Sequence, residues 1–397
     1  MSTKLALTRT LTPLAAFAFV LSACGGGGAT NAPSAAAPSQ AATPGTSQAA
    51  SEAPSGAGAG AEDPALIAAA QEEGTLTTIA LPHDWCNYGE AIETFKSKYS
   101  LEVNELDPNA GSGDEIEAIK ANQDNPGPQA PDVIDVGLSF GPSAKEEDLL
   151  QPYKVATWDS IPDEAKDPDG YWWGDYYGVL AFEVNTAVVA NVPQDWSDLL
   201  KPEYAGQIAL AGDPRVSNQA IQAVYAAALA NGGSLDDPQP GLDFFAQLNE
   251  AGNLLPGIAN AATVAAGETP ITIRWTYNAL SNRDTTAESG GPDIEVVVPA
   301  SGRFAGVYVQ GISAFAPHPN AAKLWQEFLF SDEGQNIWLK GGSRPVRLPA
   351  MEEAGTADTE ALSALPEVSG DVEFPDDEQQ TAAQQVVAER WNAEMSG

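Results

Sequence analysis

The chain beyond residue 62 alternates between two hydrophobic patterns, and each pattern predicts one kind of element. Short apolar runs predict buried strands, whereas longer stretches with apolar residues three and four positions apart predict amphipathic helices. In the helix predicted over residues 90–99, Ile92, Phe95 and Tyr99 stand on one face. The elements predicted in this part, helix and strand in turn, are residues 64–70, 76–81, 90–99, 101–106, 115–122 and 132–136. This order predicts a parallel sheet covered by helices.

The middle and the end of the chain repeat the alternation. The predicted strands there are residues 177–185, 208–211, 271–277, 294–298 and 307–315. The predicted helices there are residues 197–200, 218–231, 242–251, 320–330 and 332–340. The two series of elements predict two α/β domains.

We expect these domains to be two lobes joined by two strands that cross between them and form a hinge. The first lobe is predicted to be discontinuous, with residues 62–182 and 300–397, and the second lobe to hold residues 183–299. Ligands of open α/β sheets bind beyond the carboxyl ends of the strands. Two such sheets that face each other would share one cleft, and a hinge could close it over a solute.

The first residues have the features of an export signal. Lys4 and Arg9 precede a mostly apolar stretch at residues 11–21, which is too short to span a bilayer. The sequence LSAC then ends at Cys24 and resembles the lipobox of bacterial lipoproteins, in which the cysteine receives a lipid. Residues 1–23 are therefore a predicted signal peptide, and the mature protein is expected at the extracellular face of the membrane, held by its lipid.

Composition adds a tether and an acidic surface. Residues 25–61 are almost wholly Gly, Ala, Ser, Pro, Thr and Gln, so residues 24–61 are predicted to be a lipidated cysteine and a disordered leash. The net charge is −37, and it becomes −39 when the signal is removed. Such a surface disfavours nucleic acid and anionic lipid as partners. With Cys24 lipidated, Cys86 has no partner, so the fold must be stabilised by its own core.

Several segments resemble one family of transport proteins. The resemblance is carried by residues 73–76 (EGTL), 130–133 (APDV), 193–206 (PQDWSDLLKPEYAG), 320–325 (NAAKLW) and 331–335 (SDEGQ). In this order and spacing they resemble bacterial extracellular solute-binding proteins of the group that includes polyamine, ferric-iron, thiamine and aminoethylphosphonate binders. The block at 193–206 lies, in that family, at the entrance to the second domain.

The resemblance covers residues 65–348 and implies both a fold and a function. It implies the two-lobed fold of type II periplasmic binding proteins, a cleft that closes on a solute, and delivery to an ABC permease with a cytoplasmic ATPase. It also implies no catalysis. We further expect a monomer with no cofactor and no structural metal. The only histidines are His83 and His318. His83 and Cys86 have no further His or Cys at ligand spacing, which disfavours a zinc site or a nucleophilic pair.

The loop after the first strand offers the first candidate ligand residues. Asp84 could neutralise an ammonium group, and Trp85 and Tyr88 could form part of an aromatic cage. The corresponding loop of the polyamine binders also carries a Trp and a Tyr. The alternative is a solvated aspartate beside core aromatic residues.

Two further positions belong to the same lobe. Ser112 opens a helix, where free N–H groups bind carboxylate or phosphate, although a plain helix cap is the alternative. Ser139 and Phe140 follow the third strand, and the resemblance implies that they lie in the cleft.

The second lobe and the crossover supply the remaining candidates. Tyr177 belongs to an aromatic run that hinge packing also explains, while Asp213 and Arg215 follow a strand where the family often places ligand-contacting groups. Trp275 and Tyr277 are expected to end a strand at alternating positions, so that both point into the cleft.

The aromatic and carboxylate side chains favour a cationic organic solute, with polyamines as the nearest precedent in the family. The second acid expected after Asp213 falls at or near Val216, which departs from the polyamine pattern. Ferric iron is an alternative, although the pair Tyr176 and Tyr177 comes too early in the chain for it. A phosphorylated or carboxylated solute is a third, supported by Arg215.

Two function classes outside transport stay open. A secreted hydrolase could use Asp84 and Asp213 as paired carboxylates, and turnover of an ester, glycoside or peptide would support it. A surface adhesion protein would instead present a large exposed apolar patch.

Overall fold

The computed structural model describes residues 60–108, 110–215, 217–368 and 372–396. The predicted signal peptide, the predicted lipidation site Cys24 and nearly all of the predicted tether lie outside these residues. The described residues form one compact unit. No helix within the described ranges has both the length and the apolar character needed to cross a membrane.

The first helices and strands follow the predicted alternation. Helix α1 begins where the carboxylate of Asp63 accepts hydrogen bonds from the N–H groups of Ala65 and Leu66, and it ends at Gly74, whose φ is +76°. Strand β1 pairs in parallel with β2. The N–H of Asp132, just before β3, donates to the carbonyl of Thr77 in β1 at 2.9 Å, so β3 lies beside this pair. The elements are α1 (Pro64–Glu73), β1 (Thr75–Ile79), α2 (Tyr88–Tyr99), β2 (Glu102–Leu106), α3 (Ser112–Ala121), β3 (Val133–Gly137), α4 (Phe140–Glu146) and β4 (Leu150–Gln151).

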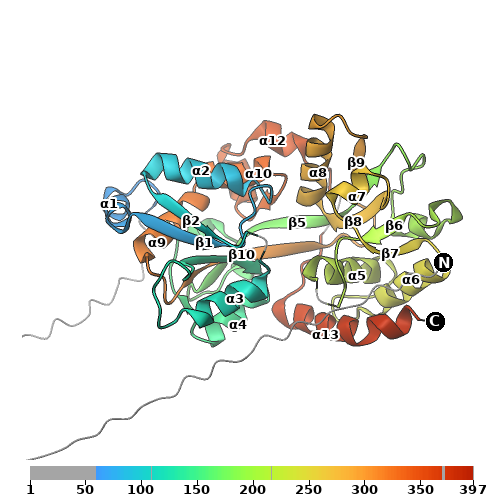
Figure 1. Cartoon of the computed structure of the whole chain (residues 1–397), viewed down its shortest axis with the longest axis horizontal. Coiled ribbons are helices and arrows are strands. Elements are labelled where there is room, and N and C mark those ends of the chain that lie inside the picture. Colours follow the sequence, from blue (N-terminus) through green and yellow to red (C-terminus); the bar gives the residue numbers. More distant parts are fainter. Residues whose placement is uncertain (1–59, 109, 216, 369–371, 397) are drawn as a thin grey trace, which may run out of the picture. The chain divides into compact units, whose positions relative to one another are not determined.

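Two long strands join this part to the rest, as the sequence predicts. Strand β5 (Trp172–Asn185) begins five residues before the predicted range. Its first half pairs antiparallel with β10 (Ala305–Ser313), which also pairs with β3, and its second half pairs with β8 and β9. Figure 1 shows β5 and β10 passing from the β1–β3 side to the β8, β6 and β7 side. We call β1–β3 with their helices the first strand group and β6–β9 with theirs the second strand group.

The second strand group is built on three parallel strands. Strand β6 pairs in parallel with both β7 and β8. The sequence misses β7 and α8 altogether, because PGI lies inside β7 and α8 has no clear apolar stripe. The elements are η3 (Trp196–Leu200), β6 (Ile208–Leu210), α5 (Asn218–Ala230), α6 (Gln239–Glu250), β7 (Leu254–Ile258), α7 (Ala261–Ala265), β8 (Ile271–Trp275), α8 (Thr276–Glu288) and β9 (Ile294–Val297).

One strand prediction is wrong in a way that affects the site. The strand predicted over residues 271–277 ends at Trp275, and α8 begins at Thr276. Tyr277 is therefore in the first turn of a helix and does not alternate with Trp275 along a strand. The hydroxyl oxygen of Thr276 accepts a hydrogen bond from the N–H of Val179 in β5 at 3.3 Å, which ties this helix start to the crossover strand.

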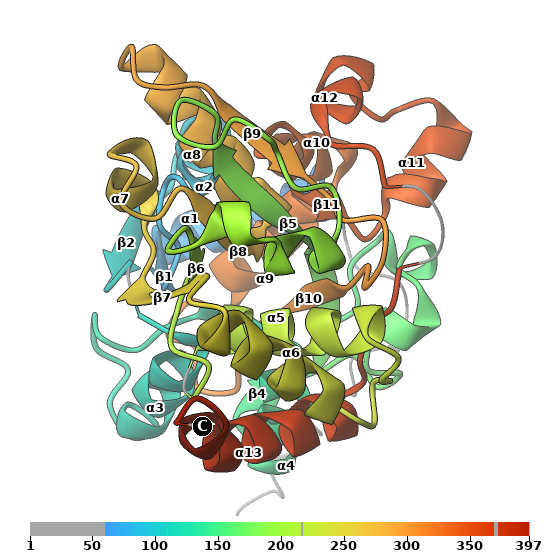
Figure 2. The same ribbon diagram turned by 90° about the vertical axis from the view of Figure 1, so that its right-hand side faces the viewer.

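The last part of the chain returns to both groups. Helices α9 (Pro319–Leu329) and α10 (Asp332–Lys340) pack near α1 and α2. Helix α13 (Asp377–Glu394) instead packs along α5 and α6, where Trp391 meets Phe245 at a ring distance of 5.5 Å (Figure 2). The lobe boundaries stay a prediction, and the assignment of all residues after 300 to the first lobe does not account for α13. Short elements between them are β11 (Arg344–Pro345), α11 (Leu348–Ala354) and α12 (Thr359–Ala364).

Candidate functional site

A cavity of about 400 Å³ opens where β1 and β3 end. Three carboxylates line it, those of Asp84, Glu115 and Asp135, together with the rings of Trp85 and Tyr308. The hydroxyl-bearing Ser112 and several Ala, Gly and Pro residues complete the lining, and none of the described residues that line it is Lys, Arg or His. We call this space the acidic cavity.

Asp135 is the central group of the acidic cavity. It lies on β3 and is 6% exposed, and its Oδ2 accepts hydrogen bonds from the hydroxyls of Tyr88 at 2.7 Å and Tyr176 at 2.9 Å. Its other oxygen, Oδ1, is buried and has no hydrogen-bond partner. The N–H of Asp135 donates to Oε2 of Glu115 at 3.0 Å, and Glu115 itself is 1% exposed. A buried acceptor without a partner is costly, so the folded protein gains free energy if a hydrogen-bond donor reaches Asp135 Oδ1.

A further buried carboxylate, outside the cavity lining, lies behind Asp135. Asp175 of β5 is fully buried, and its Oδ2 accepts a hydrogen bond from Nε2 of Gln310 at 2.8 Å. The same amide lies 3.1 Å from the hydroxyl of Tyr88, and its oxygen accepts from Gln326 at 3.0 Å. This network fixes the orientation of Tyr88, which in turn fixes Asp135.

Burial without a cation changes the acidity of all three groups. Burial raises the pKa of Asp135 to about 6 and holds the pKa of Asp175 well above its ordinary value, with repulsion from Asp135 adding to the effect on Asp175. The pKa of Glu115 is raised well above its ordinary value for the same two reasons. The folded chain therefore disfavours three negative charges in this space unless a positive charge joins them.

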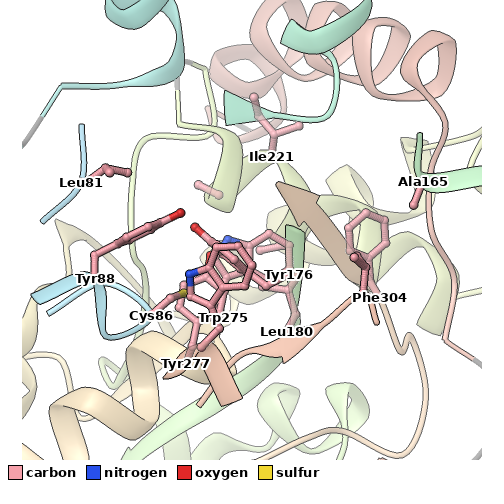
Figure 3. Close-up of a cluster of buried hydrophobic side chains, with 14 of the residues drawn as sticks. Leu81, Cys86, Tyr88, Ala165, Tyr176, Leu180, Ile221, Trp275, Tyr277 and Phe304 are labelled. Carbon is pink, nitrogen blue, oxygen red and sulfur yellow. The ribbon is translucent and has the colours of Figure 1, made fainter. Parts of the chain in front are cut away.

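Aromatic rings enclose the carboxylates on the side of the second strand group. Trp85 donates from Nε1 to the hydroxyl of Tyr176 at 2.8 Å, and its ring lies 5.1 Å from that of Tyr277 and 5.7 Å from that of Tyr308. Figure 3 shows Tyr88, Tyr176 and Tyr277 gathered in one cluster. Because Tyr277 belongs to α8, the Trp85–Tyr277 contact links the two strand groups beside the cavity.

The predicted site residues of the loop 84–88 come together here. Asp84, Trp85 and Ser112 line the acidic cavity, whereas Tyr88 is fully buried beneath it and contacts Asp135. The hydroxyl oxygen of Ser112 accepts a hydrogen bond from the N–H of Gly137 at 3.1 Å. Their role in ligand binding stays a prediction. In the structure, all of them lie in the lining of the acidic cavity or directly beneath it.

Sequence reasoning missed four members of the cluster, namely Glu115, Asp135, Asp175 and Tyr308. One signal was available, because Asp135 is the only charged residue in the otherwise apolar strand β3. An acid in a fully buried strand is rare unless it is paired or functional.

Ser139 and Phe140 lie at the start of α4, near the cavity but not in its lining. The ring of Phe140 approaches Gly137, since a Cβ built on that glycine would lie 3.8 Å from it. The same Cβ would lie 3.5 Å from the amide of Asn218 at the start of α5, so the first and second strand groups meet at this point.

Tyr177 lies away from the acidic cavity. It follows Tyr176 on β5 and lines a separate, largely apolar cavity of about 430 Å³, where its ring meets Phe374 at 5.2 Å. Alternate residues of a strand face opposite sides of the sheet, which separates Tyr177 from Tyr176.

Asp213 and Arg215 also lie elsewhere, and they satisfy each other. Nε of Arg215 lies 2.9 Å from Oδ1 of Asp213, and the guanidinium holds the pKa of that carboxyl at about 2. Both residues line a third cavity of about 530 Å³ together with Trp391 and Met395 near the end of the chain. In this structure the Asp213–Arg215 pair faces α13 and does not line the acidic cavity.

Trp275 and Tyr277 are fully buried against the crossover strands, over Gly178 and Gly306, and do not line the acidic cavity. Their rings are stacked with centroids 6.5 Å apart, and Trp275 covers Gly306 so closely that a Cβ there would lie 2.6 Å from the indole. Nε1 of Trp275 and the hydroxyl of Tyr277 are buried without a partner. The prediction that both residues end one strand at alternating positions is wrong, because Tyr277 is in α8, and their role in ligand binding stays a prediction.

The two residues considered for metal or nucleophile chemistry, His83 and Cys86, do not line the acidic cavity. No group of three or more His, Cys, Asp or Glu side chains there is arranged to hold a metal ion. His83 pairs with Glu105 at 2.7 Å and His318 with Asp132 at 2.9 Å, both outside the acidic cavity. Cys86 is buried, and burial raises the pKa of its thiol, which disfavours a reactive thiolate.

The sequence of this chain is similar to a known family and to one further bacterial protein. Residues 129–367 match the family of bacterial extracellular solute-binding proteins. An uncharacterised protein of Haemophilus influenzae is 30% identical over 271 residues, which are 64% of this chain and 72% of that protein.

Several solved structures have the same fold, and each match covers nearly the whole length of the solved chain. The periplasmic binding protein AfuA of Actinobacillus pleuropneumoniae, with fructose-6-phosphate bound, matches with 25% identity and a TM-score of 0.61, over 81% of this chain and 98% of that one. The spermidine/putrescine ABC transporter substrate-binding protein PotD of Streptococcus pneumoniae matches with 16% identity and a TM-score of 0.56, over 81% and 99%.

Proposed function

Because this chain belongs to the family of bacterial extracellular solute-binding proteins and has their two-lobed α/β fold, we propose that its acidic cavity captures a small organic cation of the polyamine type. The protein then hands this solute to the permease of an ABC importer. The lipobox at Cys24 supports retention at the outer face of the membrane by a lipid, and the residues after it support a flexible tether. Catalysis forms no part of this proposal.

The observation that carries the proposal is the charge of the cavity. Asp84, Glu115 and Asp135 line it, Asp175 lies behind it, and no basic side chain of the described residues enters it. A buried carboxylate that has lost its water gains several kcal/mol when a hydrogen-bonded cation joins it, whereas an anion at the same place would be repelled. The free energy for binding therefore favours an ammonium group.

The aromatic side chains of the cavity fit the same solute. The rings of Trp85 and Tyr308 are in contact, and the hydroxyl of Tyr176 links Trp85 to Asp135. Ammonium groups are attracted to aromatic faces by roughly 0.5–2 kcal/mol, and alkyl chains pack on the same faces. A volume of about 400 Å³ is in the range of small-molecule sites.

A phosphorylated solute is the second candidate, because AfuA was solved with fructose-6-phosphate. The helix start that would receive a phosphate is α3, and there the N–H of Gly111 already donates to the carboxylate of Asp114 at 3.0 Å. Asp114 and Glu115 place two acids in the first turn of this helix. An anion would meet these charges, so the structure favours the cation.

Thermal unfolding of the chain from residue 25 onward, measured against a panel of solutes, tests the proposal. The panel holds putrescine, spermidine, 4-aminobutyrate, thiamine, ferric citrate and fructose-6-phosphate. A solute present at 100 times its dissociation constant stabilises the folded state by about 2.7 kcal/mol, which is easily measured. Stabilisation by an amine and not by fructose-6-phosphate supports the proposal, and the reverse result transfers the site to the second candidate.

A further inference from the structure

The crossover strands β5 and β10 separate the acidic cavity from a second one, the space of about 430 Å³ lined by Tyr177, which we call the apolar cavity. On β10, Val307 lines the apolar cavity, while the next residue, Tyr308, lines the acidic cavity. On β5, Tyr177 lines the apolar cavity, while Tyr176 donates a hydrogen bond to Asp135. Because adjacent residues of a strand face opposite sides of the sheet, the two cavities lie on opposite faces of the crossover strands.

The walls of the apolar cavity are aromatic, aliphatic and rigid. Trp172 of β5 packs on Gly141 of α4, where a Cβ would lie 2.9 Å from the indole. The ring of Tyr177 meets that of Phe374, in the segment before α13, at a centroid distance of 5.2 Å, and Phe374 is 44% exposed. The other apolar side chains of the lining are Leu138, Ala165, Val307, Val346, Pro142, Pro162, Pro349 and Pro375. Prolines and packed rings lose little conformational freedom when a ligand binds, so little free energy is lost in ordering these walls.

The charged part of the lining is acidic. Among the described residues that line the cavity are Glu164, Asp376 and Asp377, and none is Lys, Arg or His. Asp376 caps α13 by accepting a hydrogen bond from the N–H of Gln379 at 2.9 Å. Oδ1 of Asp377, in contrast, is buried and has no hydrogen-bond partner. Burial raises the pKa of Asp377, and repulsion from Asp376 adds to this effect. The protein therefore gains free energy if a donor, above all a cationic one, reaches Asp377.

We propose that the apolar cavity is a second binding site, and that it takes a small aromatic amine. The ring of the ligand packs among Trp172, Tyr177 and Phe374, and its ammonium group meets Asp377. Aromatic pairs gain free energy beyond that of the buried area, and ammonium groups are attracted to both carboxylates and ring faces. The cavity volume of about 430 Å³ is in the range of small-molecule sites. The inference goes beyond the proposed function, because it concerns the opposite face of the crossover strands.

Other classes of ligand fit the apolar cavity less well. An anion would be repelled by the three acids of the lining. A purely apolar molecule would bury Oδ1 of Asp377 more deeply and still leave it without a partner. An aliphatic polyamine would supply the charge but would leave the aromatic walls without a ring to pack against. An aromatic amine is the class that satisfies the rings and the acid together.

Calorimetric titration with tryptamine tests the class of ligand. The Asp135→Asn variant is used beside the wild-type protein, because it weakens any binding of an amine in the acidic cavity. We expect tryptamine to bind both proteins at the apolar cavity with closely similar affinity. Indole-3-propionate carries the same ring with a carboxylate in place of the amine, and putrescine carries amines without a ring. Each should bind Asp135→Asn at least about tenfold more weakly than tryptamine does. No binding of tryptamine, or equally tight binding of indole-3-propionate, overturns the inference.

Two substitutions in the wild-type protein locate the bound tryptamine. Phe374→Ala removes a partly exposed ring from the lining, and Asp377→Asn removes the charge but keeps the shape of the side chain. Each should weaken tryptamine binding about fivefold or more. The matched controls are Val188→Ala, at an exposed apolar residue outside the lining, and Glu378→Gln, at the next acid of α13, also outside it. Each control should stay within about twofold of the wild type. Equal losses in the substitutions and their controls, or no loss in either substitution, overturn the inference.

The outcome is separable from that of the proposed function. Tryptamine binding that is lost in Asp135→Asn and kept in Phe374→Ala places the amine in the acidic cavity, which overturns this inference and supports the proposed function. If no amine of the solute panel binds the acidic cavity of the wild-type protein while tryptamine binding depends on Phe374 and Asp377, the proposed function fails and this inference stands. The substitutions at Phe374 and Asp377 are made in the wild-type protein, so a misfolded Asp135→Asn leaves the test intact.

Discussion

The two strand groups each place an aspartate on or just after a strand, Asp135 on β3 and Asp213 after β6, and the two aspartates have opposite environments. Asp135 of β3 is buried, has an oxygen without a partner, and has a pKa raised to about 6 by burial. Asp213, just after β6, is only partly exposed but forms an ion pair with Arg215 that lowers its pKa to about 2. The protein itself neutralises the charge of Asp213, whereas Asp135 has no counter-charge among the described residues.

This contrast shows where the protein stores free energy for binding. An ion pair that is already formed must be broken before a ligand can use either partner, so it contributes little to recognition. A buried acid without a cation destabilises the empty protein, and the solute that neutralises it recovers that free energy. Sequence reasoning proposed Asp213 as a ligand contact and missed Asp135, whereas the structure distinguishes the two by their surroundings.

The largest effect is expected from Asp135→Asn. The change removes the buried negative charge but keeps the shape of the side chain, so the amine should lose about 2–4 kcal/mol of binding free energy, or roughly 30- to 1000-fold in affinity. Calorimetric titration with whichever amine stabilises the protein measures this loss. A variant that binds within twofold of the wild type would show that the acidic cavity is not the site.

The second effect concerns stability and pH in the absence of solute. Because the pKa of Asp135 is raised in the folded state, its stabilising contribution is complete below about pH 4 and is lost as the pH rises through about 6. Relative to Asp135→Asn, the wild-type protein should therefore lose about 3 kcal/mol of unfolding free energy across this window. Urea unfolding at several pH values measures it, and parallel curves for the two proteins would contradict the raised pKa.

A smaller effect is expected from Trp85→Ala. The change removes an aromatic face of the cavity and the bridge to Tyr277, so the affinity for an amine should fall by about 1–2 kcal/mol, roughly 5- to 30-fold. Trp85→Phe is the matched control, because it keeps a ring but loses the hydrogen bond to Tyr176. If both variants lose the same affinity, the hydrogen bond matters and the ring does not.

The sequence predicted most elements and only part of the site, and the reason is the range of the contacts involved. The amphipathic segments, such as residues 90–99, are decided locally, whereas α8 has no clear apolar stripe and was missed. The loop with Trp85 was found because it follows a strand. Asp135 forms hydrogen bonds with Tyr88, which is 47 positions away in the sequence, and with Tyr176, which is 41 positions away. A local sequence pattern cannot predict contacts between such distant positions. A lone acid in an apolar strand was the available signal.

The smallest effect is expected from Arg215→Ala, which tests the ion-paired aspartate of the comparison, Asp213. Arg215 is exposed and its pair with Asp213 is formed without a solute, so its removal should cost less than about 1 kcal/mol of stability and change the affinity for an amine by less than about twofold. Asp213→Asn should behave alike. Unfolding curves and titrations of both variants measure these effects. A large loss of affinity in either would mean that the pair opens and that the second strand group contributes charge to the bound state, so that the cavity seen here is only half of the binding site.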